Sequence, residues 1–296
     1  MSGKILVTDS LFIFDEHVKK LEAAGYEVER LDKPKATEEE LCAAIKGKVG
    51  YILGGIEKVT NKVIEAADEL KAIAFTGSDW QALITGWQAA TAKEIAIASA
   101  PGANSFAVAE FSVAVALAMQ RNLFELGRTG DTKFETTGSI KSCTIGVIGS
   151  GHIGSKIIKF MQSFQPAGTL YFNRTKKGDI EAEYSNLDDL LTRSDIIFVA
   201  IPGSAGTILD DENIKKIKKG SLVVSISPAN TISFDGLLPR LKDGSLRAAV
   251  DWPAPSPEFE KLPLKAWFST NDHTAYNTHE ATQKGSDMRL IHYLTC

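Results

Sequence analysis

Three glycines follow a short apolar run at the spacing G-x-G-x-x-G, within residues 144–157 of the 296-residue chain. Gly149 would permit a sharp turn, Gly151 has no side chain to keep a pyrophosphate away from the backbone, and Gly154 would let a helix lie close to the preceding strand. The free N–H groups and the positive end of that helix would face the phosphates. The pattern predicts a buried strand, a tight turn and a helix that together bind a dinucleotide.

A cluster of cations follows the next expected strand. Residues 173–177 read Asn-Arg-Thr-Lys-Lys. In a dinucleotide fold this segment meets the adenosine ribose, and an NAD site usually has an Asp or Glu there. Because the acid is missing and three cations are present, the segment favours the 2′-phosphate of NADP, with NAD as the less favoured cofactor. A solvated basic turn without a nucleotide is the alternative.

Composition and charge exclude several classes of protein. A net charge of −4 and a pI near 5.8 argue against nucleic-acid binding, which requires a basic face. Cys42, Cys143 and Cys296 share no metal or redox spacing, so we expect reduced thiols and no metal site. No apolar run is long enough to span a membrane, and the first residues resemble a strand rather than a signal peptide. We therefore expect a cytoplasmic protein that acts on a small-molecule substrate.

Strand and helix patterns alternate along the whole chain. The capping box of Thr37 and Glu40 marks one helix start. The expected strands are 4–8, 27–31, 50–55, 72–76, 95–99, 144–148, 169–172, 195–202, 221–226, 246–251 and 267–269. The expected helices are 14–25, 37–46, 59–67, 106–126, 153–163, 187–192, 210–217, 235–242 and 279–294. This alternation predicts an α/β fold of two doubly wound parallel-sheet (Rossmann-like) domains.

Two helices carry further information on organisation. The helix at 106–126 is so apolar that it must be buried, either between the two domains or in a homodimer interface. The last helix, at 279–294, is expected to pack back on the first domain, which would make that domain discontinuous. We expect His17, His279 and His292 to be solvent-facing helix residues.

Several separate motifs together resemble the D-2-hydroxyacid dehydrogenase family, which includes phosphoglycerate dehydrogenase. The resemblance covers nearly the full length. The matching segments are Gly77-Ser78-Asp79, Pro101 to Glu110, Gly149 to Gly154, Ile201-Pro202 with Thr207, Asp243 to Asp251, and His273 with Thr278 to Ala281. The resemblance implies a substrate (flavodoxin-like) domain at 1–100 plus 275–296 and a dinucleotide-binding domain at 101–274.

The family resemblance also implies a mechanism. A hydride passes from a nicotinamide to the carbonyl carbon of a 2-keto acid, while a His donates a proton to the oxygen. A Glu orients that His, and an Arg binds the substrate carboxylate. Here the His is kept as His273, but the Arg position falls on Pro228 and the Glu position falls on Ser256. Asp251 would face the nicotinamide amide.

The two replacements predict a changed reaction. Without the Arg a substrate carboxylate would be poorly held, and without the Glu the His should be a less effective proton donor at neutral pH. Pro228 also removes a backbone donor. We therefore expect an NADP(H)-dependent oxidoreductase that reduces a carbonyl or imine other than an ordinary 2-keto acid. His273 would be the proton donor, with Ser256 or Asp272 as its partner.

The resemblance places further residues at the site. Gly54 and Gly55 would offer N–H groups where the family binds the carboxylate, and Trp80 and Trp252 would shape the substrate pocket. The residues expected to contact the cofactor are Gly149, Ser150, Gly151, His152, Ile153, Gly154, Asn173, Arg174, Thr175, Lys176, Ile201, Pro202, Thr207, Ser227, Pro228 and Asp251.

Two other hypotheses stay open. The missing Arg and Glu are also compatible with an NADP-binding protein without redox turnover, acting as a sensor or scaffold. A third hypothesis is a genuine 2-hydroxyacid dehydrogenase with a relocated carboxylate anchor, such as Lys58.

Overall fold

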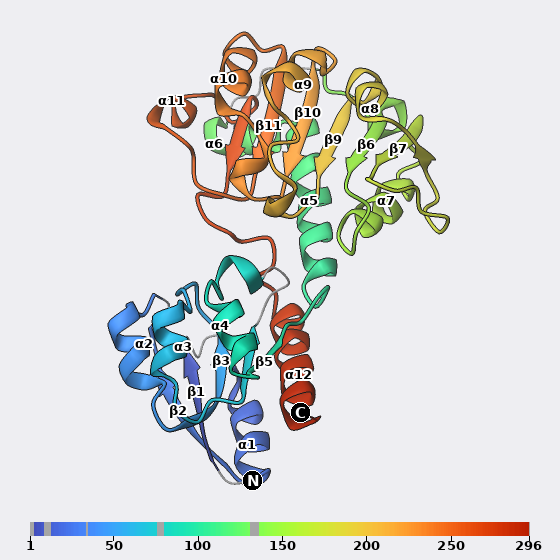
Figure 1. The fold of residues 1–296 in the computed structure, drawn as a ribbon. Coiled ribbons are helices and arrows are strands. Elements are labelled where there is room, and N and C mark those ends of the chain that lie inside the picture. The colour runs from blue at the N-terminus through green and yellow to red at the C-terminus, as the bar shows by residue number, and fades with distance from the viewer. Residues whose placement is uncertain (1–2, 9–12, 34, 76–79, 131–135, 296) are drawn as a thin grey trace. The chain divides into compact units, whose positions relative to one another are not determined.

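The computed structural model describes residues 3–8, 13–33, 35–75, 80–130 and 136–295, with side chains up to residue 288. The chain divides into two compact units (Figure 1). Unit 1 combines Met1–Asn104 with Asn277–Cys296, and unit 2 is Ser105–Tyr276. The turn expected at 77–79 and the thiol of Cys296 lie outside the described residues.

Unit 1 contains a five-stranded parallel sheet in the order β2-β1-β3-β4-β5. Its strands are β1 (Gly3–Thr8), β2 (Tyr26–Leu31), β3 (Lys48–Leu53), β4 (Ala72–Phe75) and β5 (Ala96–Ala98), and its helices are α1 (Asp15–Ala23), α2 (Glu38–Ala44), α3 (Asn61–Ala66), α4 (Trp87–Ala92) and α12 (His279–Thr295). The predicted capping box is present, because Thr37 and Glu40 bond reciprocally to each other's backbone N–H groups. Strand order reverses between β1 and β3, which places a crevice beyond their carboxyl ends.

Unit 2 contains a seven-stranded parallel sheet in the order β12-β11-β10-β9-β6-β7-β8. Its strands are β6 (Thr144–Ile148), β7 (Gly168–Phe172), β8 (Glu183–Tyr184), β9 (Ile196–Val199), β10 (Ser221–Ser225), β11 (Leu246–Val250) and β12 (Trp267–Ser269). Its helices are α5 (Ser105–Gln120), α6 (Leu123–Thr129), α7 (Gly154–Gln162), α8 (Leu187–Arg193), α9 (Asp211–Lys216), α10 (Phe234–Lys242) and α11 (Pro257–Glu260). The α/β fold class of two parallel doubly wound sheets is confirmed.

Both faces of the unit 2 sheet are buried. Alternate strand residues point to opposite faces, so Leu222 and Val224 belong to one apolar cluster and Val223 to the other. The first cluster includes side chains of α5 and α7, and the second includes side chains of α8, α9, α10 and α11. Burial on both faces explains why these strands read as continuous apolar runs.

The prediction of a single helix at 106–126 is wrong in one respect. The structure has two helices, α5 and α6, separated at Asn122. The φ angle of Asn122 is 54°, a left-handed conformation that Asn tolerates and that an α-helix cannot continue through. Apolar composition alone did not reveal this break. The short elements α4, α11 and β8 were also not predicted.

The expectation of a solvent-facing His17 is also wrong. Its side chain is 1% exposed, and Nε2 lies 3.2 Å from Oδ1 of Asp287 on α12. Phe14 stacks on the His17 ring at 5.7 Å between centroids. The partner Asp287 lies 270 residues further along the chain, so helical spacing around His17 could not predict its burial.

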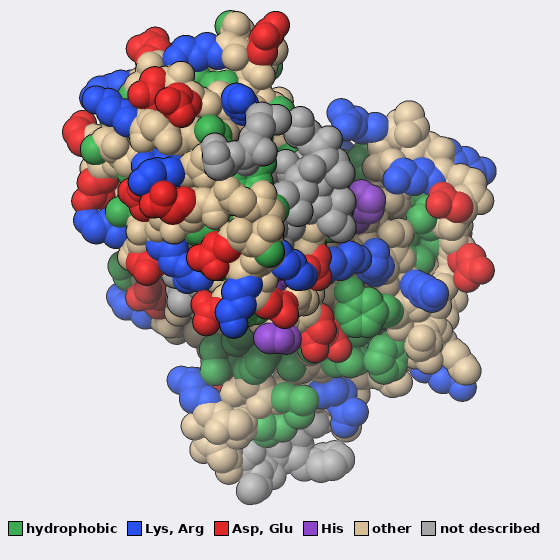
Figure 2. Space-filling view, turned by 90° about the horizontal axis from the view of Figure 1, so that it is seen from below, with side chains coloured by type: hydrophobic (Ala, Val, Ile, Leu, Met, Phe, Trp, Pro, Cys, Tyr) green, Lys and Arg blue, Asp and Glu red, His purple; other side chains and the backbone are tan. Residues whose placement is uncertain are grey.

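The surface mixes charges of both signs. On the face seen in Figure 2, basic and acidic side chains lie interspersed rather than gathered by sign. Ion pairs occur on the surface, for example Lys4 with Glu27 and Lys62 with Glu38. No helix within the described ranges is both long and apolar enough to cross a membrane.

Candidate functional site

The glycine turn lies where the strand order of unit 2 reverses, between β6 and β9. Gly149 has a φ angle of 93°, and its N–H donates to the Phe172 carbonyl at 2.8 Å. A Cβ at Gly149 would lie 2.4 Å from the Ala200 oxygen, and one at Gly154 would lie 1.8 Å from the Gly149 oxygen. Both positions therefore require glycine. A Cβ at Gly151 would meet nothing within 4 Å, so this residue borders open space.

Two features of this turn fit the phosphates of a dinucleotide. The Ser150 side chain is 1% exposed, and its hydroxyl has no hydrogen-bond partner in the part of the chain that the structure describes. No side chain caps the N-terminus of α7, so the positive end of the helix dipole faces the glycine turn, although the Ser155 and Lys156 N–H groups donate to the Gly151 and Ile153 carbonyls. His152, which follows the open position, is exposed. The residues present therefore fit a pyrophosphate.

The basic turn after β7 is bonded to the glycine turn. Lys177 donates from Nζ to the Ser150 carbonyl at 3.0 Å, and the Tyr171 hydroxyl donates to the Lys177 carbonyl at 2.9 Å. Arg174 and Lys176 are exposed, and neither forms an ion pair with another described residue. Asn173 donates from its amide to the Thr175 carbonyl at 3.1 Å. The expected cofactor residues at 173–176 thus lie beside the glycine turn with their cations unneutralised.

The loops after β9 and β10 are fastened to each other. Ser227 accepts from the Ile201 N–H at 2.8 Å and donates to the Val199 carbonyl at 3.0 Å. Thr207 donates to the Asn230 carbonyl at 2.9 Å. Ser227, expected beside the cofactor, therefore uses its buried hydroxyl within the protein. Pro202 and the exposed Pro228 each precede a short 3₁₀ turn, at Gly203–Ala205 and Ala229–Thr231.

Asp251, at the end of β11, holds the loop that carries His273. Its carboxylate is 6% exposed and accepts three hydrogen bonds. Oδ1 accepts from the Thr270 hydroxyl at 3.1 Å and the Thr274 N–H at 2.9 Å, and Oδ2 accepts from the Ala275 N–H at 3.0 Å. Sequence reasoning assigned Asp251 to the nicotinamide and did not reveal this contact. The only sequence signal was an acid directly after an apolar strand.

The His273 imidazole is exposed, and within the described residues it forms no hydrogen bond. Asp272, one expected partner, instead accepts the His273 backbone N–H at 2.7 Å. Ser256, the other expected partner, is half-buried at the start of α11 and neither caps that helix nor bonds to the ring. The structure thus brings the loop residues together around Asp251 but does not pair the imidazole.

The two tryptophans expected to shape the substrate pocket differ. Trp252 is 2% exposed, packs against Phe234 and Trp267, and donates from Nε1 to the Ser227 carbonyl at 3.1 Å. It is therefore a core residue and not a pocket wall. Trp80 is half-buried in unit 1 and meets Trp87 edge-on at 6.3 Å.

A buried carboxylate lies beside Gly54 at the crevice of unit 1. The Gly54 N–H donates to the Thr8 hydroxyl at 3.4 Å. The Thr8 hydroxyl lies 3.2 Å from the Tyr51 hydroxyl, and the Tyr51 hydroxyl donates to Glu57 Oε1 at 2.9 Å. Glu57 is 3% exposed, and its Oε2 has no partner in the described ranges. Burial, together with the nearby carboxylate, raises the pKa of Tyr51 well above its usual value. Gly55 is also buried, and no sequence pattern indicated that Glu57 would join this group.

No group of three or more His, Cys, Asp or Glu side chains that could hold a metal ion occurs in the described ranges. Two parallel α/β units, one with an open glycine turn at its switch point, define a dinucleotide-binding fold.

Comparison with known proteins identifies the family. Residues 113–279 match the model of the D-isomer specific 2-hydroxyacid dehydrogenase, NAD binding domain. The chain therefore belongs to the D-isomer specific 2-hydroxyacid dehydrogenases, and it is an NAD(P)-dependent oxidoreductase of that type.

Two similar sequences serve as examples. A glyoxylate reductase of Thermofilum pendens is 29% identical over 84% of this chain and 78% of its own length. A D-3-phosphoglycerate dehydrogenase of Methanocaldococcus jannaschii is 32% identical over 83% of this chain and 48% of its own length. The chain thus spans about half of that second relative.

Similar folds occur in solved structures. The acyclic imino acid reductase Bsp5, in complex with NADPH and D-Arg, has a TM-score of 0.85 at 21% identity, covering 96% of this chain and 94% of its own. The NAD+-bound 3-phosphoglycerate dehydrogenase of Entamoeba histolytica also has a TM-score of 0.85, at 20% identity, covering 99% and 95%. At these identities the likeness concerns the fold alone.

Proposed function

We propose that this protein is an NADP(H)-dependent oxidoreductase that reduces a carbonyl or imine on a substrate other than an ordinary 2-keto acid. The observation that carries the proposal is that the sequence has Pro228 and Ser256 where the family resemblance places the Arg that holds a carboxylate and the Glu that pairs the imidazole. The glycine turn and His273 persist beside these replacements. A bound nicotinamide would supply the hydride.

His273 is the proposed proton donor. Asp251 holds its loop through three hydrogen bonds to positions on both sides of His273. Bonds to an ionised acceptor are worth roughly 1.5–3 kcal/mol each, so the backbone that carries the imidazole is well fixed. An exposed imidazole on a fixed backbone can present its N–H to a substrate oxygen or nitrogen.

The loop after β3 supports a substrate without a carboxylate. If Gly54 and Gly55 face the substrate, Glu57 places a buried acid in the same loop and in the same hydrogen-bond chain as Gly54. An ionised Glu57 would oppose a substrate carboxylate bound in this loop, because two like charges ~8 Å apart repel by about 2 kcal/mol at an effective dielectric of ~20. A neutral or cationic substrate group would avoid this cost.

NADP is the proposed cofactor, with NAD less favoured. Arg174 and Lys176 form no ion pairs with other described residues, and Lys177 holds their turn against Ser150. Unneutralised cations at this place would bind a 2′-phosphate. Calorimetric titration with NADPH and NADH tests this choice, and R174Q should weaken only NADPH.

The test of the reaction uses matched substrates. NADPH oxidation should be faster with glycolaldehyde, alone or with ammonium to form an imine, than with glyoxylate or hydroxypyruvate. H273Q should lower turnover by roughly a hundredfold or more with unchanged NADPH affinity, because it removes only the proton donor. H279Q, at an exposed histidine of unit 1, is the control and should leave turnover unchanged. Equal turnover in H273Q would remove His273 from the mechanism.

The unpaired imidazole favours a second candidate, an NADP-binding protein without redox turnover. NADPH binding by calorimetry, without oxidation by any carbonyl or imine, would support that function. Strong turnover of glyoxylate that K58Q abolishes would instead support a 2-hydroxyacid dehydrogenase anchored by Lys58. Lys58 is exposed and forms no ion pair with other described residues.

A homodimer is also part of the proposal. Phe106 on α5 and Leu123 and Leu126 on α6 are large apolar side chains on the surface of unit 2. A partner copy would cover them. Light scattering should give the mass of a dimer for the native chain and of a monomer for L123E.

A further inference from the structure

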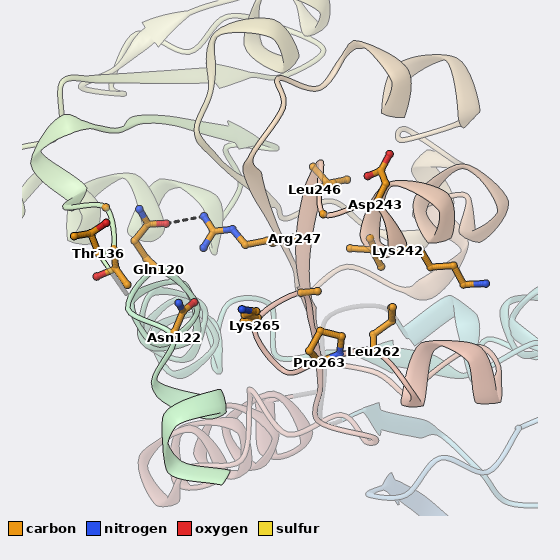
Figure 3. Close-up of a pocket in the computed structure, with 15 residues that line it drawn as sticks. Gln120, Asn122, Thr136, Lys242, Asp243, Leu246, Arg247, Leu262, Pro263 and Lys265 are labelled. Carbon is orange, nitrogen blue, oxygen red and sulfur yellow. Dashed lines mark hydrogen bonds between the residues drawn. The ribbon is translucent and has the colours of Figure 1, made fainter. Parts of the chain in front are cut away.

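Unit 2 contains a cavity of about 510 Å³ (Figure 3). It lies at the end of the sheet where the strands begin, opposite to the end that carries the glycine turn. Gly244 and Leu246, at the start of β11, line it, whereas Gly149 follows the end of β6. In a parallel sheet all strands begin at one end of the sheet and finish at the other. The cavity, at the amino ends of the strands, is therefore separate from the nucleotide site at their carboxyl ends. Its volume lies in the range of small-molecule sites.

Arg247 gives this cavity a positive charge. Its Nη2 donates to Gln120 Oε1 at 2.9 Å and to the Gly220 carbonyl at 3.5 Å, and Nη1 donates to the Met119 carbonyl at 3.3 Å. These partners are neutral, and no described carboxylate forms an ion pair with the guanidinium. Burial lowers the pKa of Arg247 from its usual value, although a guanidinium stays charged at neutral pH.

The charged neighbours do not neutralise Arg247. Asp243 also lines the cavity, but its carboxylate accepts from the Ser245 N–H at 2.8 Å, and Lys242 forms an ion pair with Glu258. Figure 3 shows Lys242 and Asp243 pointing away from the Arg247 guanidinium. A partly buried cation with only neutral partners is costly, which an anionic ligand would offset.

The rest of the lining offers donors for an anion. Asn122 and Thr136 contribute an amide and a hydroxyl, and Lys265 also lines the cavity. In Figure 3, Asn122 and Lys265 lie together on one side of the cavity, with Gln120 and Arg247 across from them. Leu262 and Pro263 add an apolar wall, which suits a ligand with a carbon skeleton.

We propose that this cavity is a second ligand site, which binds the carboxylate or phosphate group of a small metabolite. The guanidinium would bind a planar or tetrahedral oxyanion by donating hydrogen bonds from its remaining N–H groups, as is typical of Arg. Gln120, on α5, would hold the guanidinium in place. The site does not depend on the proposed redox function.

The test measures anion binding to the full chain without nucleotide. The probes are citrate and glycerol 3-phosphate, with chloride at equal ionic strength as the reference, and the readouts are calorimetry and the melting temperature. Phosphate groups could also bind the glycine turn, so G151A is included to obstruct that turn. Stronger binding of citrate would identify a carboxylate ligand, and stronger binding of glycerol 3-phosphate would identify a phosphate ligand.

We expect saturable binding that persists in G151A and weakens at least tenfold in R247Q. K219Q is the matched control, because Lys219 is exposed and does not line the cavity. If R247Q does not fold, R247K keeps the charge but loses the planar fork and should weaken binding by roughly fivefold. Anion binding that is unchanged in R247Q would overturn the proposal, as would unchanged binding in R247K if R247Q does not fold. Anion binding that is lost in G151A but kept in R247Q would also overturn it.

Discussion

Replacement of Asp251 by Asn tests whether this carboxylate holds the His273 loop. The amide of Asn keeps the shape and one acceptor oxygen, but its NH₂ group would face a backbone N–H that now donates to the carboxylate. At least one N–H, of Thr274 or Ala275, would lose its acceptor in a site that is 6% exposed. A lost bond to a charged group with a buried donor left unpaired costs roughly 2–4 kcal/mol.

Amide hydrogen exchange is the assay that resolves this loop. A local loss of that size should speed the exchange of the Thr274 and Ala275 amides by roughly 30- to 1000-fold, since about 1.4 kcal/mol corresponds to a factor of ten. T270V is the graded control. It removes the Thr270 hydroxyl, which donates to Asp251 and to the Asp272 carbonyl and accepts from the Asp272 N–H, but it keeps the acceptors of the Thr274 and Ala275 amides. It should therefore speed the exchange of these two amides less than D251N does.

Thermal unfolding separates a local effect from a global one. If the loop opens without the rest of unit 2, the melting temperature of D251N falls little. If the loop is integral to unit 2, each kcal/mol lowers that temperature by about 2–4 °C. Unchanged exchange of Thr274 and Ala275 in D251N would refute the assignment of Asp251 as the residue that fixes this loop.

Three further predictions concern other parts of the chain. G154A should destabilise unit 2 strongly, because its Cβ would lie 1.8 Å from a carbonyl oxygen, and differential scanning calorimetry measures this effect. G151A should fold normally but bind NADPH at least tenfold more weakly, as measured by calorimetric titration. Because burial and Glu57 raise the pKa of Tyr51, the unfolded chain loses this proton first as pH rises above about 10, so stability should fall by up to about 1.4 kcal/mol per pH unit there. Denaturant unfolding from pH 9 to 11 should show a shallower decline in Y51F. T37A removes the capping box and should cost about 1 kcal/mol in denaturant unfolding, and an unchanged midpoint would contradict the assignment.

Sequence reasoning predicted the elements whose causes are local. The G-x-G-x-x-G turn and the capping box at Thr37 each depend on residues within a few positions of one another, and the structure places both in the expected segments. Strands such as β3, β4, β9 and β10 were predictable because they are buried on both faces and therefore read as apolar runs.

The contacts that sequence reasoning missed join distant segments. His17 was placed in solvent because its partner Asp287 belongs to the opposite end of the chain. Trp252 was placed at the substrate because its core neighbours were unknown. Loops that fold back on one another create the hydrogen bonds between Asp251 and residues 270–275 and the series of hydrogen bonds from Glu57 to Gly54. The hydrophobic periodicity of the sequence does not predict such loop conformations. Such contacts decide which polar groups remain available for chemistry.

The two segments that make up unit 1 impose an order on biosynthesis. The helix α12 packs on α1, β4 and β5, although all of unit 2 is translated between them. Unit 2 can therefore fold on the ribosome while the N-terminal sheet still waits for its last helix. Until α12 arrives, the surfaces of α1, β4 and β5 that it covers stay open, so the newly made N-terminal segment is the part that would most need a chaperone.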